Sequence, residues 1–359
     1  MQNIIKLLRL QKVYIFFISF VLFKIIFSTT LLHANTFKVS DIKISSPFEL
    51  NFKKNSVIDK GFQISFSNLL TMITTSNDKS RLEYIPIKQL KSMIDSFTIS
   101  DEKFINNEYF AKLETTFNKK KILNFLERKN IFPSMPIRNK VLLVPILVDV
   151  ESENIYLFNE NIFYSSWNNN KKNYQLLDYL LPSEDIEDLS KIQKMSSSIE
   201  SYDFVNLIKK YDLKDYIVLI IYKNKNEFKV LSKINLNNSL KVHNQKYTKI
   251  NLDNEKDLKK IIENQKIIYE DHWKENNQIN TSIKLPINVS VSSKNYERII
   301  ELEEAFSNID LISDFYILKF NSEITQYKII YNGSPKNFFI NMSNKSLDLI
   351  MEDNVWTVK

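Results

Sequence analysis

The sequence predicts an α+β fold built from several modules. Its 359 residues exceed the length of a typical single domain and favour two or three. A hydrophobic content of 43% and an aromatic content of 13% allow substantial buried cores. Stretches with helical apolar spacing alternate along the chain with strand-like stretches. We expect two mixed α/β modules, residues 35–150 and 151–278, then a C-terminal ferredoxin-like β-α-β-β-α-β module, residues 279–359.

The segment ahead of these modules, residues 1–34, has the three parts of a secretory signal peptide. Lys6, Arg9 and Lys12 precede an unbroken apolar run, and small residues then lead to Ala34. Basic residues before an apolar run keep the N-terminus inside and direct the rest outward. We therefore expect a periplasmic protein, either cleaved after Ala34 or anchored to the inner membrane by this segment and facing the periplasm.

The positive charge of the chain comes largely from the same segment. The net charge is +7, and four of these positive charges, with no acid beside them, lie in residues 1–34, so +3 remains for the rest. Such a small excess removes most of the support for nucleic-acid binding. We expect no nucleic-acid partner.

Missing residue types exclude several kinds of chemistry. The chain has no Cys, which excludes thiol catalysis, Cys-ligated zinc and iron–sulfur clusters. Its two glycines, Gly61 and Gly333, cannot build the turns of dinucleotide-binding or phosphate-binding loops. We interpret His243 and His272 as surface or interfacial residues, although a Ser-His-Asp triad stays open because its members need only meet in space. We expect no metal and no cofactor.

In residues 35–150 the pattern predicts the order β-α-α-β-α-β. The expected elements are a strand at 37–44, helices at 55–73 and 86–97, a strand at 109–117, a helix at 119–129 and a buried strand at 141–148. The stretch "SNDKS" is expected to be a loop, and Asn118 to cap the third helix. Pro145 indicates a bulge or an edge within the last strand.

The middle module begins with aromatic-rich sequence and continues with helices and strands. We expect a helix from Pro182 or Ser183, a helix at 202–211, a strand at 216–222, strands near 227–234 and 240–250, and a helix at 254–273.

The last module should contain a strand at 287–291, a helix at 294–306, paired strands at 315–320 and 324–331, a short helix from Pro335 and a closing hairpin around 352–354. This order predicts a small ferredoxin-like sandwich.

The densest group of acids lies in "LLPSEDIEDLSKIQ" and has two interpretations. The four carboxylates are those of Glu184, Asp185, Glu187 and Asp188. With Ser183 as N-cap, they stand where the positive end of a helix dipole favours acids, with Ile186 and Leu189 on the buried side and the acids on a solvated rim. The alternative is a pair of catalytic carboxylates in a hydrolase.

The aromatic stretch "NIYLFNENIFYSSW" also has two interpretations. Phe163, Tyr164 and Trp167 would form a platform for a small ligand, or they anchor this segment to a core. The second role is the commoner one for such aromatic density.

Three segments resemble the domain-of-unknown-function 2066 family of exported proteobacterial proteins. They are "FKVSDIKI" with "VIDKGFQISFSNLLTMI", "LLVPILVD" with "LFNENIFYSSW", and "LLPSEDIEDLSKI" with "LIKKYDLKDYIVLIIY". The resemblance spans most of residues 37–359, but Ser183 and Glu184 stand where the family often has a glycine. It implies an exported α+β protein and carries over no catalytic residues.

These observations favour a non-enzymatic protein of the cell envelope that acts in interaction or assembly with other envelope proteins. Two alternatives remain: a carboxylate-dependent periplasmic hydrolase acting on a glycan or peptide, and a periplasmic protein that binds a small ligand. The protein would contact the inner membrane only through residues 1–34, and only if that segment is not cleaved.

Overall fold

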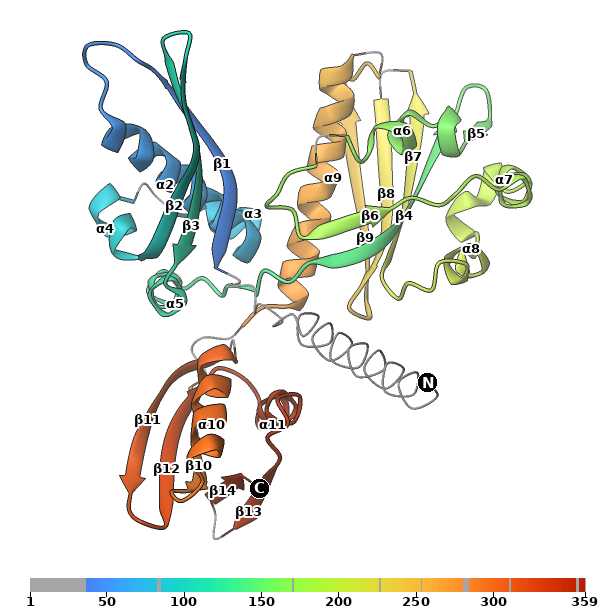
Figure 1. The fold of residues 1–359 in the computed structure, drawn as a ribbon. Coiled ribbons are helices and arrows are strands. Elements are labelled where there is room, and N and C mark those ends of the chain that lie inside the picture. The colour runs from blue at the N-terminus through green and yellow to red at the C-terminus, as the bar shows by residue number, and fades with distance from the viewer. Residues whose placement is uncertain are drawn as a thin grey trace, which may run out of the picture. The chain divides into compact units, whose positions relative to one another are not determined.

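The computed structural model confirms the α+β class (Figure 1). It describes residues 37–82, 85–169, 171–225, 227–252, 254–279, 284–309, 311–352 and 355–358, which belong to one compact unit. The expected signal peptide, residues 1–34, lies outside the described residues. Within the described ranges, no helix is long and apolar enough to cross a membrane.

The first sheet is antiparallel and has the strand order β1-β3-β2. Its strands are β1 (Lys38–Pro47), β2 (Ile94–Ile105) and β3 (Glu108–Phe117). Helix α2 (Lys54–Ile73) packs on it with the expected apolar face buried. Gly61 allows the close approach, because a Cβ there would lie 2.7 Å from Leu113 Cδ2.

Two predictions for this part of the chain are wrong. The helix expected at 86–97 ends early: α4 (Ile87–Ser92) is followed by β2, because pairing with β3 holds Ile94 and the residues after it extended. The stretch "SNDKS", expected to be a loop, is the short helix α3 (Ser76–Ser80). Thr75 caps it, because its side chain accepts a hydrogen bond from the N–H of Asp78.

Helix α5 (Lys119–Glu127) confirms the expected helix and its cap. The side chain of Asn118 accepts a hydrogen bond from the backbone N–H of Lys121 at 2.8 Å. Ile122 and Leu126 on its inner face are fully buried. The helix thereby extends the core under the first sheet.

The second sheet has the strand order β5-β4-β7-β8-β9, with β6 also paired to β4. The strands are β4 (Asn139–Asp149), β5 (Asn154–Tyr156), β6 (Leu177–Leu180), β7 (Tyr216–Asn224), β8 (Glu227–Leu236) and β9 (Ser239–Thr248). Strand β4 pairs in parallel with β7, so the strand expected to complete the first module belongs to this sheet. The predicted order β-α-α-β-α-β therefore lacks β2, and its last strand forms as expected but belongs to another sheet.

Pro145 lies in the middle of β4 without a bulge in its pairing to β7. The N–H of Leu142 donates to Asp215 on the β7 side, so alternation directs the nitrogen of Pro145 to the opposite side. There β6 pairs only with residues 139–142 and β5 only with 147–149. Proline thus occupies an edge-like gap where no ladder hydrogen bond is lost.

Helices cover both faces of the second sheet (Figure 1). Helices α6 (Ile162–Ser166) and α9 (Glu255–Asn276) pack on one face, and α7 (Ile186–Gln193) and α8 (Val205–Lys209) on the other. Along β4 the odd-numbered Val141 and Leu143 face the first pair, and the even-numbered Leu142 and Val144 face the second. Both faces are buried, which explains why β4 and β7 are apolar throughout. Helix α8 is shorter than the expected 202–211.

The third sheet has the strand order β11-β12-β10-β14-β13. Its strands are β10 (Leu285–Ser292), β11 (Ile312–Phe320), β12 (Ile324–Tyr331), β13 (Leu349–Glu352) and β14 (Val355–Val358), with helices α10 (Tyr296–Asn308) and α11 (Pro335–Ser343). Every element expected here is confirmed, including the closing hairpin, in which Glu352 pairs with Val355. Ser334 caps α11, with Pro335 in its first turn.

Candidate functional site

The acidic stretch begins helix α7, as the capping interpretation predicts, but two residues later than expected. The cap is Asp185, whose side chain accepts hydrogen bonds from the N–H groups of Glu187 at 2.9 Å and Asp188 at 3.1 Å. Ser183 is not the cap: its own N–H donates to the hydroxyl of Tyr211 at 2.7 Å. That bond holds Ser183 in the segment ahead of the helix.

The expected orientation of α7 is wrong in part, because Leu189 packs against the core but Ile186 and Asp188 do not lie as expected. Ile186, expected to be buried, is 84% exposed, whereas Asp188, expected on the solvated rim, is 9% exposed. The cause is Lys210, whose ammonium lies 2.8 Å from Asp185 and 2.7 Å from Asp188 and draws both carboxylates toward α8. This hydrogen-bonded lysine lowers the pKa of Asp185, and the N–H groups of the helix add to the effect.

The remaining two acids of the stretch have surface positions. Glu187 pairs with Lys191 one turn later at 2.6 Å, and Glu184 is exposed ahead of the helix. Across the part of the chain that the structure describes, no group of three or more metal-ligating side chains could hold a metal ion. The structure therefore gives these carboxylates roles in capping and surface pairing.

Two members of the aromatic cluster, Phe163 and Trp167, lie in the core on one face of the second sheet. Phe163 and Trp167 have no exposed surface. The indole of Trp167 stacks on Tyr269 at a centroid distance of 6.2 Å and meets the edge of Tyr179 at 5.6 Å. Tyr164 is half-buried and donates to the carbonyl of Pro182 at 2.8 Å. This packing ties α6 to the core, and a ligand role for the three residues stays a prediction.

The two histidines differ in exposure. His272 in α9 is 4% exposed, so of the two expected positions, surface or interfacial, the surface one is wrong for it, and burial lowers its pKa. Its Nε2 lies 3.4 Å from the carbonyl oxygen of Ser239. His243 lies on β9, as expected, and is partly exposed.

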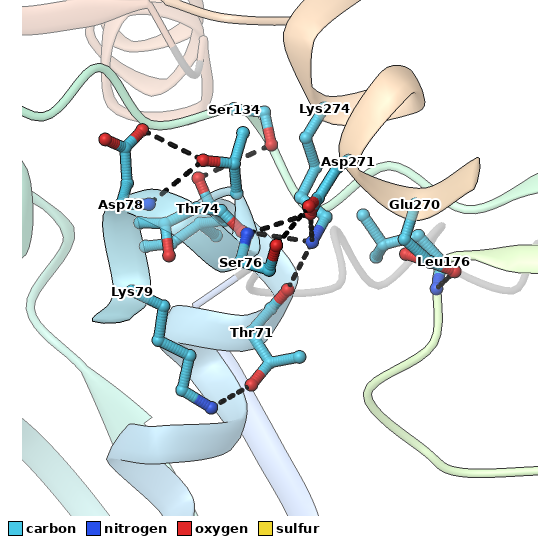
Figure 2. A network of polar contacts seen from close by, with 12 residues as sticks. Thr71, Thr74, Ser76, Asp78, Lys79, Ser134, Leu176, Glu270, Asp271 and Lys274 are labelled. Atoms are coloured by element: carbon cyan, nitrogen blue, oxygen red, sulfur yellow. Dashed lines mark hydrogen bonds and ion pairs between the residues drawn. The ribbon is translucent and has the colours of Figure 1, made fainter. Parts of the chain in front are cut away.

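A polar junction that the sequence did not reveal joins α9 to the end of α2 and the start of α3 (Figure 2). The ammonium of Lys274, 4% exposed, donates to the carbonyls of Thr71 at 2.9 Å and Thr74 at 3.0 Å. Carbonyls at the end of a helix have no partner within it, so the lysine supplies one and also meets the negative end of the α2 dipole.

Asp271 completes this junction. Its carboxylate lies 3.3 Å from the ammonium of Lys274 and accepts from the N–H of Ser76 at 2.9 Å and from the hydroxyl of the same serine. Helices α2, α3 and α9 are thus held together by charge-assisted hydrogen bonds. A β-bridge between Ser134 and Gln278 connects the same parts of the chain.

Glu270, next to Asp271 in α9, is a buried carboxyl group. It is 7% exposed and accepts hydrogen bonds from the N–H groups of Leu176 and Leu177, both at 2.8 Å. Burial raises its pKa, although these two hydrogen bonds act in the opposite direction. Glu270 fixes the beginning of β6 against α9.

A group of exposed, mutually packed aromatic rings lies at the end of the first sheet, and we name it the tip patch. Its packed rings are Phe48, Phe52 and Phe104, and we include the exposed Leu50 and Ile105, which lie close to them in sequence. Phe48 contacts both Phe52 and Phe104 at centroid distances of 5.0 Å. All members except the half-buried Phe52 are at least 50% exposed, and Leu50 is fully so. The rings pack on one another while leaving apolar surface open.

Comparison with protein-family models finds no match for the chain, and comparison with curated proteins also finds none. The family resemblance of the three quoted segments therefore stays a prediction.

Proposed function

We propose that this is a non-enzymatic protein of the cell envelope that binds another envelope protein through the tip patch. The single observation that carries the proposal is the exposed, mutually packed ring cluster of Phe48, Phe52 and Phe104. Exposed apolar patches on a folded protein mark interaction sites, and aromatic side chains dominate the energy of such contacts.

The chemistry of the tip patch favours a protein partner with an apolar pocket. The surrounding charges balance one another: Lys54 pairs with Glu102 at 2.6 Å, and Lys103 and Glu49 lie close in sequence to the patch. A rim of mixed charge around an aromatic centre is the usual anatomy of a protein–protein interface. A nucleic acid or an anionic surface would instead be met by a basic rim.

The location and the finer architecture belong to the same proposal. The basic, apolar and small-residue order of residues 1–34 supports export to the periplasm, with or without retention at the inner membrane. The order β11-β12-β10-β14 supports a ferredoxin-like C-terminal module after two α/β modules. The module differs from a ferredoxin-like sandwich by the added strand β13. This strand precedes β14 in the chain and reverses its direction, so that β14 pairs in parallel with β10.

Site-specific photocrosslinking in intact cells tests the proposal. A photoreactive phenylalanine analogue replaces Phe104 or Leu50 in the tip patch. The matched control places it at Ile186, which is equally apolar and 84% exposed but lies alone on α7. We expect one reproducible protein adduct from both tip positions and none from Ile186.

The adduct must also depend on the neighbouring rings. Phe48→Ser should reduce the Phe104 adduct at least fivefold while leaving the amount of folded protein unchanged, since Phe48 is 50% exposed. Equal adducts from Ile186 and the tip positions, or no adduct at all, would overturn the proposal.

A further inference from the structure

A pocket of about 500 Å³ lies between the α2–α3 segment and α9, beside the polar junction. Its volume is within the range of small-molecule sites, roughly 300–1,000 Å³. Four lysines line it: Lys79 of α3, Lys172 of the segment before β6, and Lys266 and Lys274 of α9. Figure 2 shows Lys79 and Lys274 approaching Thr71 from different elements.

Two of these lysines lack a carboxylate partner. Lys274 pairs with Asp271, and Lys172 lies 3.7 Å from Glu263. In the described ranges, neither Lys79 nor Lys266 has a carboxylate oxygen within the 4.0 Å of an ion pair. The sequence does not show that these four lysines share one pocket, because they come from three separate segments.

The hydrogen bonds of these two lysines leave donor capacity unused. Lys79 donates to the hydroxyl of Thr71, and Lys266 to the carbonyl of Trp167 at 2.7 Å. An ammonium group has three N–H donors, so each has two beyond the hydrogen bond described here. The ammonium of Lys266 also lies 5.8 Å and 5.7 Å from the ring centroids of Trp167 and Tyr179. Lys266 is only 4% exposed, and water has little access to it.

The electrostatics of the pocket agree with its geometry. Burial lowers the pKa of Lys266 to about 8, and the neighbouring Lys172 and Lys171 oppose its charge while Glu263 and Glu270 favour it. Burial also lowers the pKa of Lys79, and the charge of Lys274 lowers it further. Glu263, Glu270 and Asp271 also line the pocket, so its four lysines exceed its carboxylates by one. Since Asp271 pairs with Lys274 and Glu263 with Lys172, an anion would supply the direct partner that Lys79 and Lys266 lack.

We propose that this pocket binds a small organic anion, whose carboxylate or phosphate oxygens accept hydrogen bonds from Lys79 and Lys266. Tyr174 and Ile267, which also line the pocket, would contact the carbon part of the ligand. The site stands apart from the tip patch and does not depend on the proposed partner binding. It is a different ligand site from the buried aromatic cluster that the sequence suggested.

Isothermal titration calorimetry on the full chain at pH 7 tests this site. The probes are succinate, inorganic phosphate and, at equal ionic strength, chloride. We expect saturable binding of succinate, phosphate or both, and none of chloride. Binding of succinate alone would identify a carboxylate site, binding of phosphate alone a phosphate site, and binding of both a general oxyanion site.

Matched variants connect the binding to the two lysines. Lys79→Gln and Lys266→Gln should each weaken binding at least tenfold, and Lys225→Gln, at a lysine whose side chain is 78% exposed, should leave it unchanged. If Lys266→Gln does not fold, the partly exposed Lys79 decides the question alone. The proposal is overturned if neither anion binds, or if Lys79→Gln binds as tightly as the unaltered protein.

Discussion

The two lysines Lys210, beside α7, and Lys266, on α9, lie in opposite electrostatic surroundings. Lys210 faces two carboxylates within 2.8 Å and remains partly exposed, and these hydrogen bonds raise its pKa. Lys266 is buried against a carbonyl and two aromatic rings, and burial lowers its pKa to about 8. The comparison shows that a charged side chain is free to bind a ligand when it lacks an oppositely charged partner and is buried. The number of charges in its stretch of sequence matters less.

The same contrast separates the two groups of acids. Asp185 and Asp188 come from the densest acidic stretch in the chain, yet they cap a helix and pair with one lysine. Glu270 and Asp271 are adjacent in an ordinary amphipathic helix, yet Glu270 fixes the start of β6 and Asp271 lies in the polar junction with α2 and α3. The predictions below test this contrast, beginning with the largest expected effect.

Removing the charge of Lys274 should destabilise the protein most. Lys274→Met leaves two helix-end carbonyls and Asp271 without their buried partner, so we expect the free energy of unfolding to fall by about 3–5 kcal/mol. Urea denaturation measures this. The control is Lys241→Met, which removes the exposed pair with Glu275 and should cost less than about 1 kcal/mol. Equal losses of unfolding free energy from both variants would contradict the difference between the buried and the exposed lysine.

Glu270 should make stability depend on pH. Because its pKa is raised above the ordinary 4.5, the folded protein retains this proton longer than the unfolded chain. The contribution of Glu270 to the free energy of unfolding is complete below pH 4.5, and it is lost as the pH rises through the raised pKa. Glu270→Gln keeps an acceptor for Leu176 and Leu177 but cannot titrate, so the loss should disappear.

Melting temperatures of both proteins between pH 4 and 8 provide the measurement. As the pH rises, the melting temperature of the unaltered protein should fall relative to that of Glu270→Gln, because only the unaltered protein has the titrating carboxyl group. A difference that is constant across this range would show that Glu270 is not buried as described.

The smallest effect is expected in the acidic stretch. Asp185→Ala removes the cap of α7 and one partner of Lys210, and should lower the melting temperature by about 3 °C. Glu184→Ala, one residue earlier and exposed, should change it by less than about 1 °C. Calorimetry of the two variants side by side measures both. A larger effect from Glu184 would return this stretch to consideration as a functional site.

The sequence predicts most of this fold because local patterns agree with the tertiary structure. The apolar face of α2 is buried, Asn118 caps its helix, α11 begins at Pro335, and the centre of β7 is apolar because both faces of its sheet are covered. Strand β2 was missed, because its mostly exposed side chains carry little apolar alternation and its pairing with β3 is what keeps it extended. The sheet membership of β4 depends on a long-range parallel pairing that no local pattern reveals.

The lysine-lined pocket is harder to predict for the same reason. Lys266, Glu270 and Lys274 follow one another at four-residue spacing, which indicates a shared face of α9. A charged face of this kind is usually solvated, and only its contact with α2, α3 and the segment before β6 buries it. The spacing was a usable signal for the face, but its burial is a tertiary property.

The most direct test is an NMR titration of the lysine side chains in the full chain labelled with ¹³C-lysine, followed with and without saturating succinate or phosphate. We expect Lys266 to titrate near pH 8 alone and at a higher pH with the anion, while Lys210 stays protonated throughout. A Lys266 that titrates at the ordinary lysine value of 10.5 in both samples would contradict the account.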